Sequence, residues 1–325
     1  MISSVFGKTK PVNYILVLTS LFVCFILIRF GPFPLEDPVS ELPAQTLALA
    51  CLLFSVLAVN FIVQRNQLTG PHSYAIYFFG VLVLMFPESM VDRQTILANF
   101  FILLALRRLI SLKSLRDTKA KIFDGTLWIL ISSLFLNWSV LFLALVWIHI
   151  YFYDPKNLRN WLVPLAAMAA FALIGIAVAF LAGRPDYFAS HYRFEWEGMG
   201  AYWSAWGHAF KIGLYLLAVF LAGLVSFLIL GKSGHGKVLP MRLTALTLLL
   251  TMVVVIFRSS DEHHPVLLTF YPSAVFLSKY VETVRRDSIR EGVLLGSLVF
   301  CLVSYKSSCC FAHKSSRLKH TQQTS

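Results

Sequence analysis

Long apolar runs, separated by short polar or charged stretches, recur along almost the whole chain. Several approach the roughly 20 residues that an α-helix needs to cross a hydrocarbon core of about 30 Å. The pattern predicts membrane spans at residues 12–30, 44–63, 73–87, 95–111, 126–137, 139–153, 161–182, 209–230, 243–257, 266–281 and 292–304. A transmembrane β-barrel would instead show ten-residue strands of alternating hydrophobicity. The predicted fold is therefore all-α, a polytopic transmembrane bundle of about 10–11 spans within residues 1–305.

Composition agrees with this interpretation. The chain is 58% hydrophobic and only 14% charged, more apolar surface than one soluble core of this size could bury. The net charge of +12 does not indicate nucleic-acid binding, because most lysines and arginines lie in short loops between apolar runs. The basic tail, residues 306–325, has no periodicity, and we expect it to be disordered.

The distribution of basic residues predicts which loops face the cytosol. Alternate loops carry 18 lysines and arginines, whereas the remaining loops and span ends carry six. Cytoplasmic loops of membrane proteins are enriched in these residues. We therefore expect the N-terminus to be cytoplasmic and the protein to lie in the bacterial inner membrane. The scheme holds only if residues 126–153 cross twice rather than once, and it leaves open whether residues 292–304 span at all.

With this orientation, acids and histidines gather on the outer side. The first outer loop, GPFPLEDPVSELP, contains Glu36 and Asp37 between prolines. Two later outer loops contain PESMVDR and RSSDEHHP, and an aromatic loop covers residues 183–207. The outer residues that could bind a substrate are Arg29, Arg93, Arg258, Asp261, His263 and His264.

These residue types suit a particular chemistry at a membrane surface. A carboxylate can act as general base on an acceptor hydroxyl, which is the role we assign to Asp37 or Glu36. Arginines at the headgroup level can bind a lipid phosphate through charge-assisted hydrogen bonds. The DEHH stretch could supply metal ligands, but adjacent residues rarely chelate one ion, so we predict no metal and no cofactor.

Three stretches carry a loose resemblance to a known class of enzymes. The acidic PLEDP after the first span, the basic loop and helices beginning ALRRLISLKSLRDTKAKIFDG, and HPVLLTFYPSAVFLSKYVE are similar to parts of GT-C glycosyltransferases. That resemblance implies a polyprenyl-phosphate-linked sugar as donor. The whole chain more closely resembles an uncharacterised family of polytopic inner-membrane proteins of Bacteroidota, through its first residues and the RRLISL…FD stretch. The second resemblance implies no activity.

The leading functional hypothesis is sugar transfer from a polyprenyl-phosphate donor at the outer face of the membrane. One alternative is a non-catalytic membrane subunit of an envelope, secretion or motility assembly. A transporter is a weaker alternative, because almost no acid or base falls in the middle of a predicted span. Membrane lipid is the expected partner, nucleic acid is not, and the sequence indicates no particular protein partner.

Overall fold

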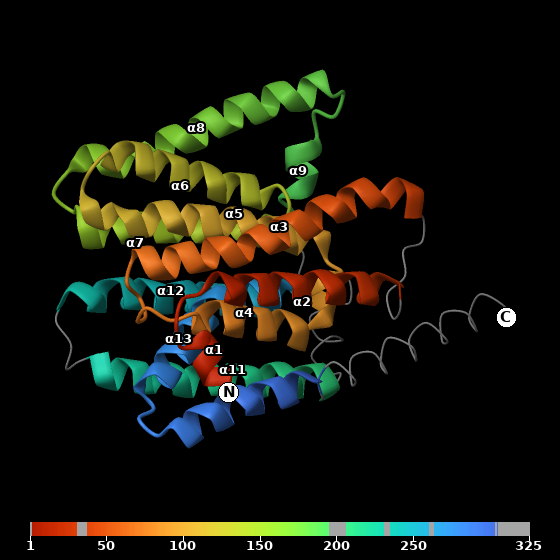
Figure 1. The fold of residues 1–325 in the computed structure, drawn as a ribbon. Helices are drawn as coiled ribbons and strands as arrows, with labels where there is room; N and C mark the ends of the chain where they lie inside the picture. Colours follow the sequence, from red (N-terminus) through yellow and green to blue (C-terminus); the bar gives the residue numbers. More distant parts are fainter. Residues whose placement is uncertain are drawn as a thin grey trace.

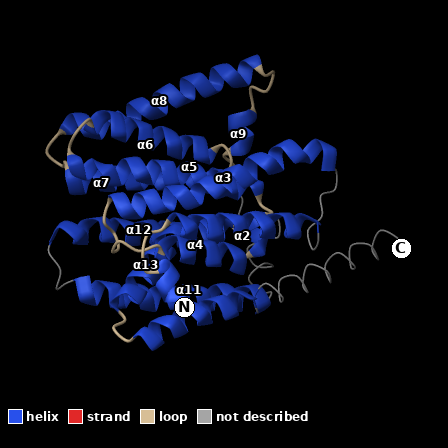
Figure 2. Cartoon of the chain, in the orientation of Figure 1, coloured by secondary structure: helices blue, strands red, loops and turns tan. Residues whose placement is uncertain are grey.

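The computed structural model describes residues 2–30, 38–194, 206–230, 235–259, 263–302 and 304. Within these ranges the chain is helical almost throughout, and no residue there belongs to a β-strand (Figure 2). The predicted all-α class is confirmed. The tail and the residues from Gly31 to Asp37 lie outside the described part of the chain.

Sixteen helical elements have defined bounds. They are α1 (Ile2–Phe6), α2 (Pro11–Phe30), α3 (Pro38–Arg65), α4 (Tyr74–Met85), η1 (Pro87–Met90), α5 (Arg93–Ile110), η2 (Ser111–Ser114), α6 (Thr118–Ser133), η3 (Asn137–Phe142), α7 (Leu143–Tyr153), α8 (Leu158–Leu181), α9 (Tyr187–His191), α11 (Trp206–Leu230), α12 (His235–Arg258), η4 (Pro265–Thr269) and α13 (Phe270–Thr283). Residues 287–302 form a further helix. The η elements are 3₁₀-helices.

The long helices lie side by side with their axes roughly aligned (Figure 1). Six helical segments of the described chain are long and apolar enough to cross a membrane: Pro11–Arg29, Glu41–Arg65, Arg93–Ser114, Leu158–Leu181, Ala209–Ile229 and Val238–Arg258. Two shorter apolar helices, Tyr74–Met85 and Asn137–Tyr153, lie among them. The protein is therefore a multi-pass membrane protein, and several of the predicted spans are helices shorter than 18 residues.

Burial separates central helices from peripheral ones. In α4 every residue except Leu84 is buried, so this short helix lies at the centre of the bundle. In α8 only four residues are buried, and Leu181 is 89% exposed. In Figure 1, α8 lies at the edge of the bundle beside α6. An exposed apolar helix of this length would be unfavourable in water but is well solvated by lipid tails.

The structure shows that residues 126–153 contain two helices joined by a turn. Helix α6 ends at Ser133, the chain turns, and η3 with α7 returns along α6 as a hairpin. The end of α7 lies back beside η2, next to the start of α6. The segment is therefore two antiparallel helices, as the charge distribution required, rather than one long tilted helix.

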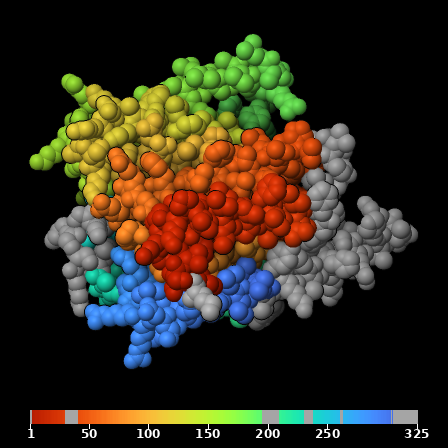
Figure 3. Space-filling model, in the orientation of Figure 1, coloured from red at the N-terminus to blue at the C-terminus, as the bar shows by residue number. Residues whose placement is uncertain are grey.

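Side-chain contacts fix the two ends of the bundle. At one end, here called the Asp92 end, Arg29 on the last turn of α2 contacts Val91, and His264 after α12 contacts Asp92. At the other end, the His72 end, Gly70 before α4 donates to Glu282 at the end of α13. The N-terminal helices cover the face shown in Figure 3, with residues after 263 visible below them.

The basic stretch from Arg107 to Phe123 is divided between the end of α5, η2 and the start of α6. Leu109 and Leu112 face the bundle and are fully buried. Only Leu115 is exposed, because the chain turns there through a left-handed conformation, φ 51°.

Candidate functional site

A buried carboxylate organises the Asp92 end. Asp92 is the N-cap of α5: its Oδ1 accepts from Thr95 N at 3.0 Å and its Oδ2 from Thr95 Oγ1 at 2.6 Å. The sequence builds this cap locally, because an aspartate directly before a helix can reach the free N–H of its first turn. Oδ2 also accepts the backbone N–H of His264 at 2.9 Å. Asp92 thus ties the loop after α12 to the start of α5.

The same contacts keep Asp92 ionised. Burial alone would raise the pKa of its carboxyl, but the contacts from His263, Thr95 and His264 outweigh burial and hold the pKa at about 2. The Nδ1 atom of His263 lies 3.7 Å from Oδ2, which allows an ion pair when the imidazole is protonated. A carboxylate with this low pKa and these donors is a weak proton acceptor, so Asp92 positions neighbouring groups rather than acting as a general base.

Arg29 joins the first span to this centre. Its Nη2 donates to Gln45 Oε1 at 2.7 Å and to the Val91 carbonyl at 2.9 Å, one residue before Asp92. Glu41 and Arg93 both lie within electrostatic reach of this guanidinium. Two arginines near each other, on the last turn of α2 and the first turn of α5, therefore flank the Asp92 cap.

A second ion pair joins α11 to η1. Lys211 Nζ on α11 lies 3.5 Å from Glu88 Oε2 and 4.5 Å from the centre of the Phe86 ring. Both charged side chains are nearly buried, with exposed fractions of 12% and 11%. The pair is a fixed part of the bundle, since neither charge could remain there without compensation.

A cavity of about 260 Å³ opens at this end, between the start of α5, the end of α12 and the segment around α9. Its polar lining comes from Gln94, Asn137, Ser190, His191, Arg193 and Arg258. Asn137 donates to the Arg193 carbonyl at 3.1 Å and so closes one wall. Trp138 completes the cavity and is stacked on Phe257, with ring centres 5.6 Å apart. The cavity combines two guanidinium groups, amides and an indole ring.

The structure places five of the predicted site residues at this one end. Arg29 and Arg93 lie beside the Asp92 cap, His263 and His264 contact Asp92, and Arg258 lines the cavity.

The other three candidates, Glu36, Asp37 and Asp261, lie outside the described residues. Among residues that are described, no group of three or more histidine, cysteine, aspartate or glutamate side chains could hold a metal ion.

Sequence reasoning did not select Asp92, Gln94, Asn137 or Trp138 as site residues. The pattern D-x-x-T at Asp92 is a recognisable N-cap signal, although it predicts a structural role. Asn137 and Trp138 could be found only once the turn between α6 and α7 was known to lie beside α12 and α9.

A family model matches residues 8–312, nearly the full chain. The chain belongs to the family of unknown function DUF6427. The predicted membership of an uncharacterised family is thereby confirmed. No curated protein and no solved structure matches this DUF6427 chain. Because the function of this family is unknown, membership implies no activity, and any functional conclusion depends on the chemistry of the site.

Proposed function

We propose that this membrane protein binds a polyprenyl-phosphate-linked sugar at the Asp92 end and transfers the sugar to an acceptor hydroxyl. The Asp92 end would face away from the cytosol across the bacterial inner membrane. This orientation follows from charge: the basic residues of α5, η2 and the start of α6 belong to the opposite end.

The observation that carries the proposal is the cavity containing Arg193, Arg258 and Trp138 at the end of a membrane bundle. Two guanidinium groups can bind a phosphate diester by charge-assisted hydrogen bonds. The indole can pack against a sugar ring, and Gln94 and Asn137 can hydrogen-bond sugar hydroxyls. A volume of about 260 Å³ suits a phosphate with part of one sugar, while the lipid tail stays in the bilayer.

Residues of this chain could carry out each part of the proposed sugar transfer. The acceptor hydroxyl oxygen attacks the anomeric carbon and forms the new glycosidic bond. The bond from that carbon to the lipid-phosphate oxygen breaks, and its electron pair leaves on the phosphate, stabilised by arginine. The hydroxyl proton passes to Glu36 or Asp37, the acids after the first span. Asp92 is unsuited to this last role because its pKa is about 2.

Lipid analysis of the purified protein tests binding. We expect a polyprenyl phosphate or its sugar adduct to co-purify, and to be lost in Arg258→Ala but retained in Arg184→Ala. Arg184 is an exposed arginine at the same end that does not line the cavity. Absence of such a lipid from the wild-type protein would overturn the proposal.

A second variant tests catalysis separately. Replacing both Glu36 and Asp37 with alanine should leave the lipid bound but abolish transfer. If the double variant fully complements a deletion strain, the protein is not this enzyme. The alternative hypothesis of a non-catalytic membrane subunit then remains.

A further inference from the structure

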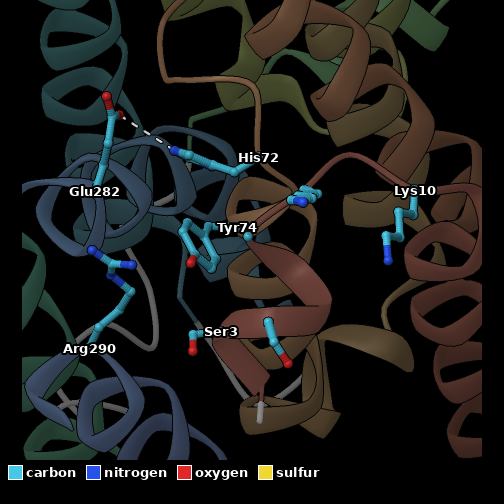
Figure 4. A pocket seen from close by; sticks show the side chains of 9 residues that line it. Ser3, Lys10, His72, Tyr74, Glu282 and Arg290 are labelled. Carbon is cyan, nitrogen blue, oxygen red and sulfur yellow. Dashed lines mark ion pairs between the residues drawn. The ribbon is translucent and has the colours of Figure 1, made fainter. Parts of the chain in front are cut away.

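A second and larger cavity, about 510 Å³, opens at the His72 end. It lies between α1, the chain before α2, the turn before α4, the end of α13 and the last helix. Lys8, Lys10, His72, Tyr74, Glu282 and Arg290 are part of its lining (Figure 4). It is separate from the Asp92 end and plays no part in the function proposed above.

Backbone contacts hold the turn that carries His72. Ser73 N donates to the Phe6 carbonyl at 2.8 Å, which attaches the turn to α1. Gln64 Nε2 donates to the His72 carbonyl at 2.9 Å, which attaches it to the end of α3. The cavity wall is therefore built from segments far apart in sequence.

The buried histidine faces the cavity with unused hydrogen-bonding capacity. His72 is 7% exposed, and neither ring nitrogen has a hydrogen-bond partner among the described residues. Its Nε2 lies 3.5 Å from Glu282 Oε2, in the direction drawn in Figure 4. Because Nε2 is directed toward Glu282, Nδ1 is the buried ring atom that lacks a partner and that a bound ligand could contact.

The acid in the cavity is already compensated. Lys279 Nζ lies 3.0 Å from both carboxylate oxygens of Glu282, and Gly70 N donates to Oε2 at 3.2 Å. Burial would raise the pKa of Glu282, but the contacts from His72, Lys279 and Gly70 hold it at about 2. Glu282 is therefore a fixed carboxylate whose charge is neutralised from outside the cavity.

The remaining charge of the cavity is positive. Lys8 and Lys10 are exposed, and no described acid lies within ion-pair distance of either ammonium group. Arg290 Nη2 donates to the Val284 carbonyl at 2.8 Å, and its Nη1 pairs with Asp287 Oδ1 at 3.2 Å. Asp287 is 88% exposed and does not line the cavity, and the buried Nε of Arg290 has no hydrogen-bond partner among the described residues. In Figure 4, Lys10 and Arg290 approach the cavity from opposite sides.

We propose that this cavity is a binding site for a phosphate-bearing anion, contacted by Lys8, Lys10 and Arg290, with the His72 ring contacting the rest of the ligand. Two lysines and an arginine around one space can bind a phosphate through charge-assisted hydrogen bonds. The volume lies within the range of small-molecule sites and exceeds what a phosphate alone would fill. The rings of His72 and Tyr74, with centres 4.5 Å apart and planes tilted by 40°, offer apolar contact to the rest of the ligand.

The phosphate could come from an anionic lipid headgroup or from a soluble phosphorylated molecule, and two probes distinguish these sources. The full chain in phosphatidylcholine nanodiscs is titrated with short-chain phosphatidic acid and, separately, with glycerol 3-phosphate, and heat is measured. Binding of the lipid alone identifies a headgroup site, whereas binding of both probes identifies a site for soluble phosphates. Each of these results supports the proposal.

Matched charge variants test where the probe binds. Lys8→Ala with Lys10→Ala should weaken binding roughly tenfold or more, since charge-assisted hydrogen bonds are lost. Arg116→Ala with Lys119→Ala removes the same charge from exposed positions outside the cavity and should change affinity less than about threefold.

Since Lys8 and Lys10 are exposed, their replacement leaves the fold intact. Lys8→Arg with Lys10→Arg should retain binding. The proposal is wrong if neither probe binds to the wild-type protein, or if the two double alanine variants weaken binding equally.

Discussion

Replacing Asp92 by asparagine tests the view that this carboxylate holds the Asp92 end together. The substitution keeps the size of the side chain and one carbonyl oxygen, which can still accept from Thr95 N. It places an amide NH₂ where Oδ2 now accepts from Thr95 Oγ1 and His264 N, at 2.6 and 2.9 Å. The His264 N–H then faces an amide donor, in a side chain that is only 3% exposed.

Two estimates of the cost agree. A hydrogen bond to a charged group contributes about 1.5–3 kcal/mol, and neighbouring bonds are not additive. The fall of the pKa from 3.8 to about 2 corresponds to about 2 kcal/mol, at roughly 1.4 kcal/mol for each pH unit. We therefore expect Asp92→Asn to lower the free energy of unfolding by about 2–3 kcal/mol at neutral pH.

Reversible denaturation in mixed micelles measures this free energy. Asp186→Asn is the matched control, because Asp186 is also an N-cap aspartate but is exposed and makes no side-chain cap bond. Its effect should stay within about 0.5 kcal/mol. If Asp92→Asn is as mild as the control, the carboxylate does not hold the loop after α12, and the interpretation of this end is wrong.

Three further results are expected. Lys211→Met alone should destabilise by about 3 kcal/mol because it removes the ammonium group 3.5 Å from the nearly buried Glu88 carboxylate, whereas adding Glu88→Gln should recover most of the loss; equal losses in the single and double variants would contradict this. Asp92 and Glu282 have folded pKa values of about 2, below their unfolded values, so the stability that they contribute is complete above about pH 5 and is lost as the pH falls toward 2. Denaturation at stepped pH should therefore show no decrease in the free energy of unfolding from these two groups between about pH 8 and pH 5. Leu115→Gly should leave stability unchanged or raise it by up to about 1 kcal/mol, since glycine accepts φ 51° at this exposed position, and a clear loss in thermal unfolding would refute the assigned conformation.

Much of the fold could be predicted because apolar length and helix formation are local properties. The long spans α3 and α8 follow directly from continuous apolar runs between polar loops. Which helices lie at the centre could not be predicted, because α4 and α8 both consist mainly of apolar residues, yet one is buried and the other is exposed. In a membrane, hydrophobicity marks contact with lipid as much as contact with protein.

The site was predictable only in part. Charge placed Arg29, Arg93 and Arg258 on the same side of the bundle, and they do lie at one end. Their separation into a cap region and a cavity depends on tertiary packing, chiefly on the turn at Asn137 reaching α9. The charged cavity around His72 could not be predicted either, because in the sequence Lys8 and Lys10 cannot be distinguished from ordinary basic residues of a cytoplasmic loop.

Two of the 3₁₀-helices lengthen the short α-helices that follow them. Helices α7 and α13, with 11 and 14 residues, would extend only about 17 and 21 Å at an α-helical rise. The preceding η3 and η4, with six and five residues, add about 12 and 10 Å because 3₁₀ winding rises further per residue. Each composite then matches a hydrocarbon thickness of about 30 Å without tilting. Rewinding η3 as α-helix would shorten this composite by about 3 Å and draw Asn137 inward, so the length of the helix that crosses the bilayer also sets the position of one wall of the cavity at the Asp92 end.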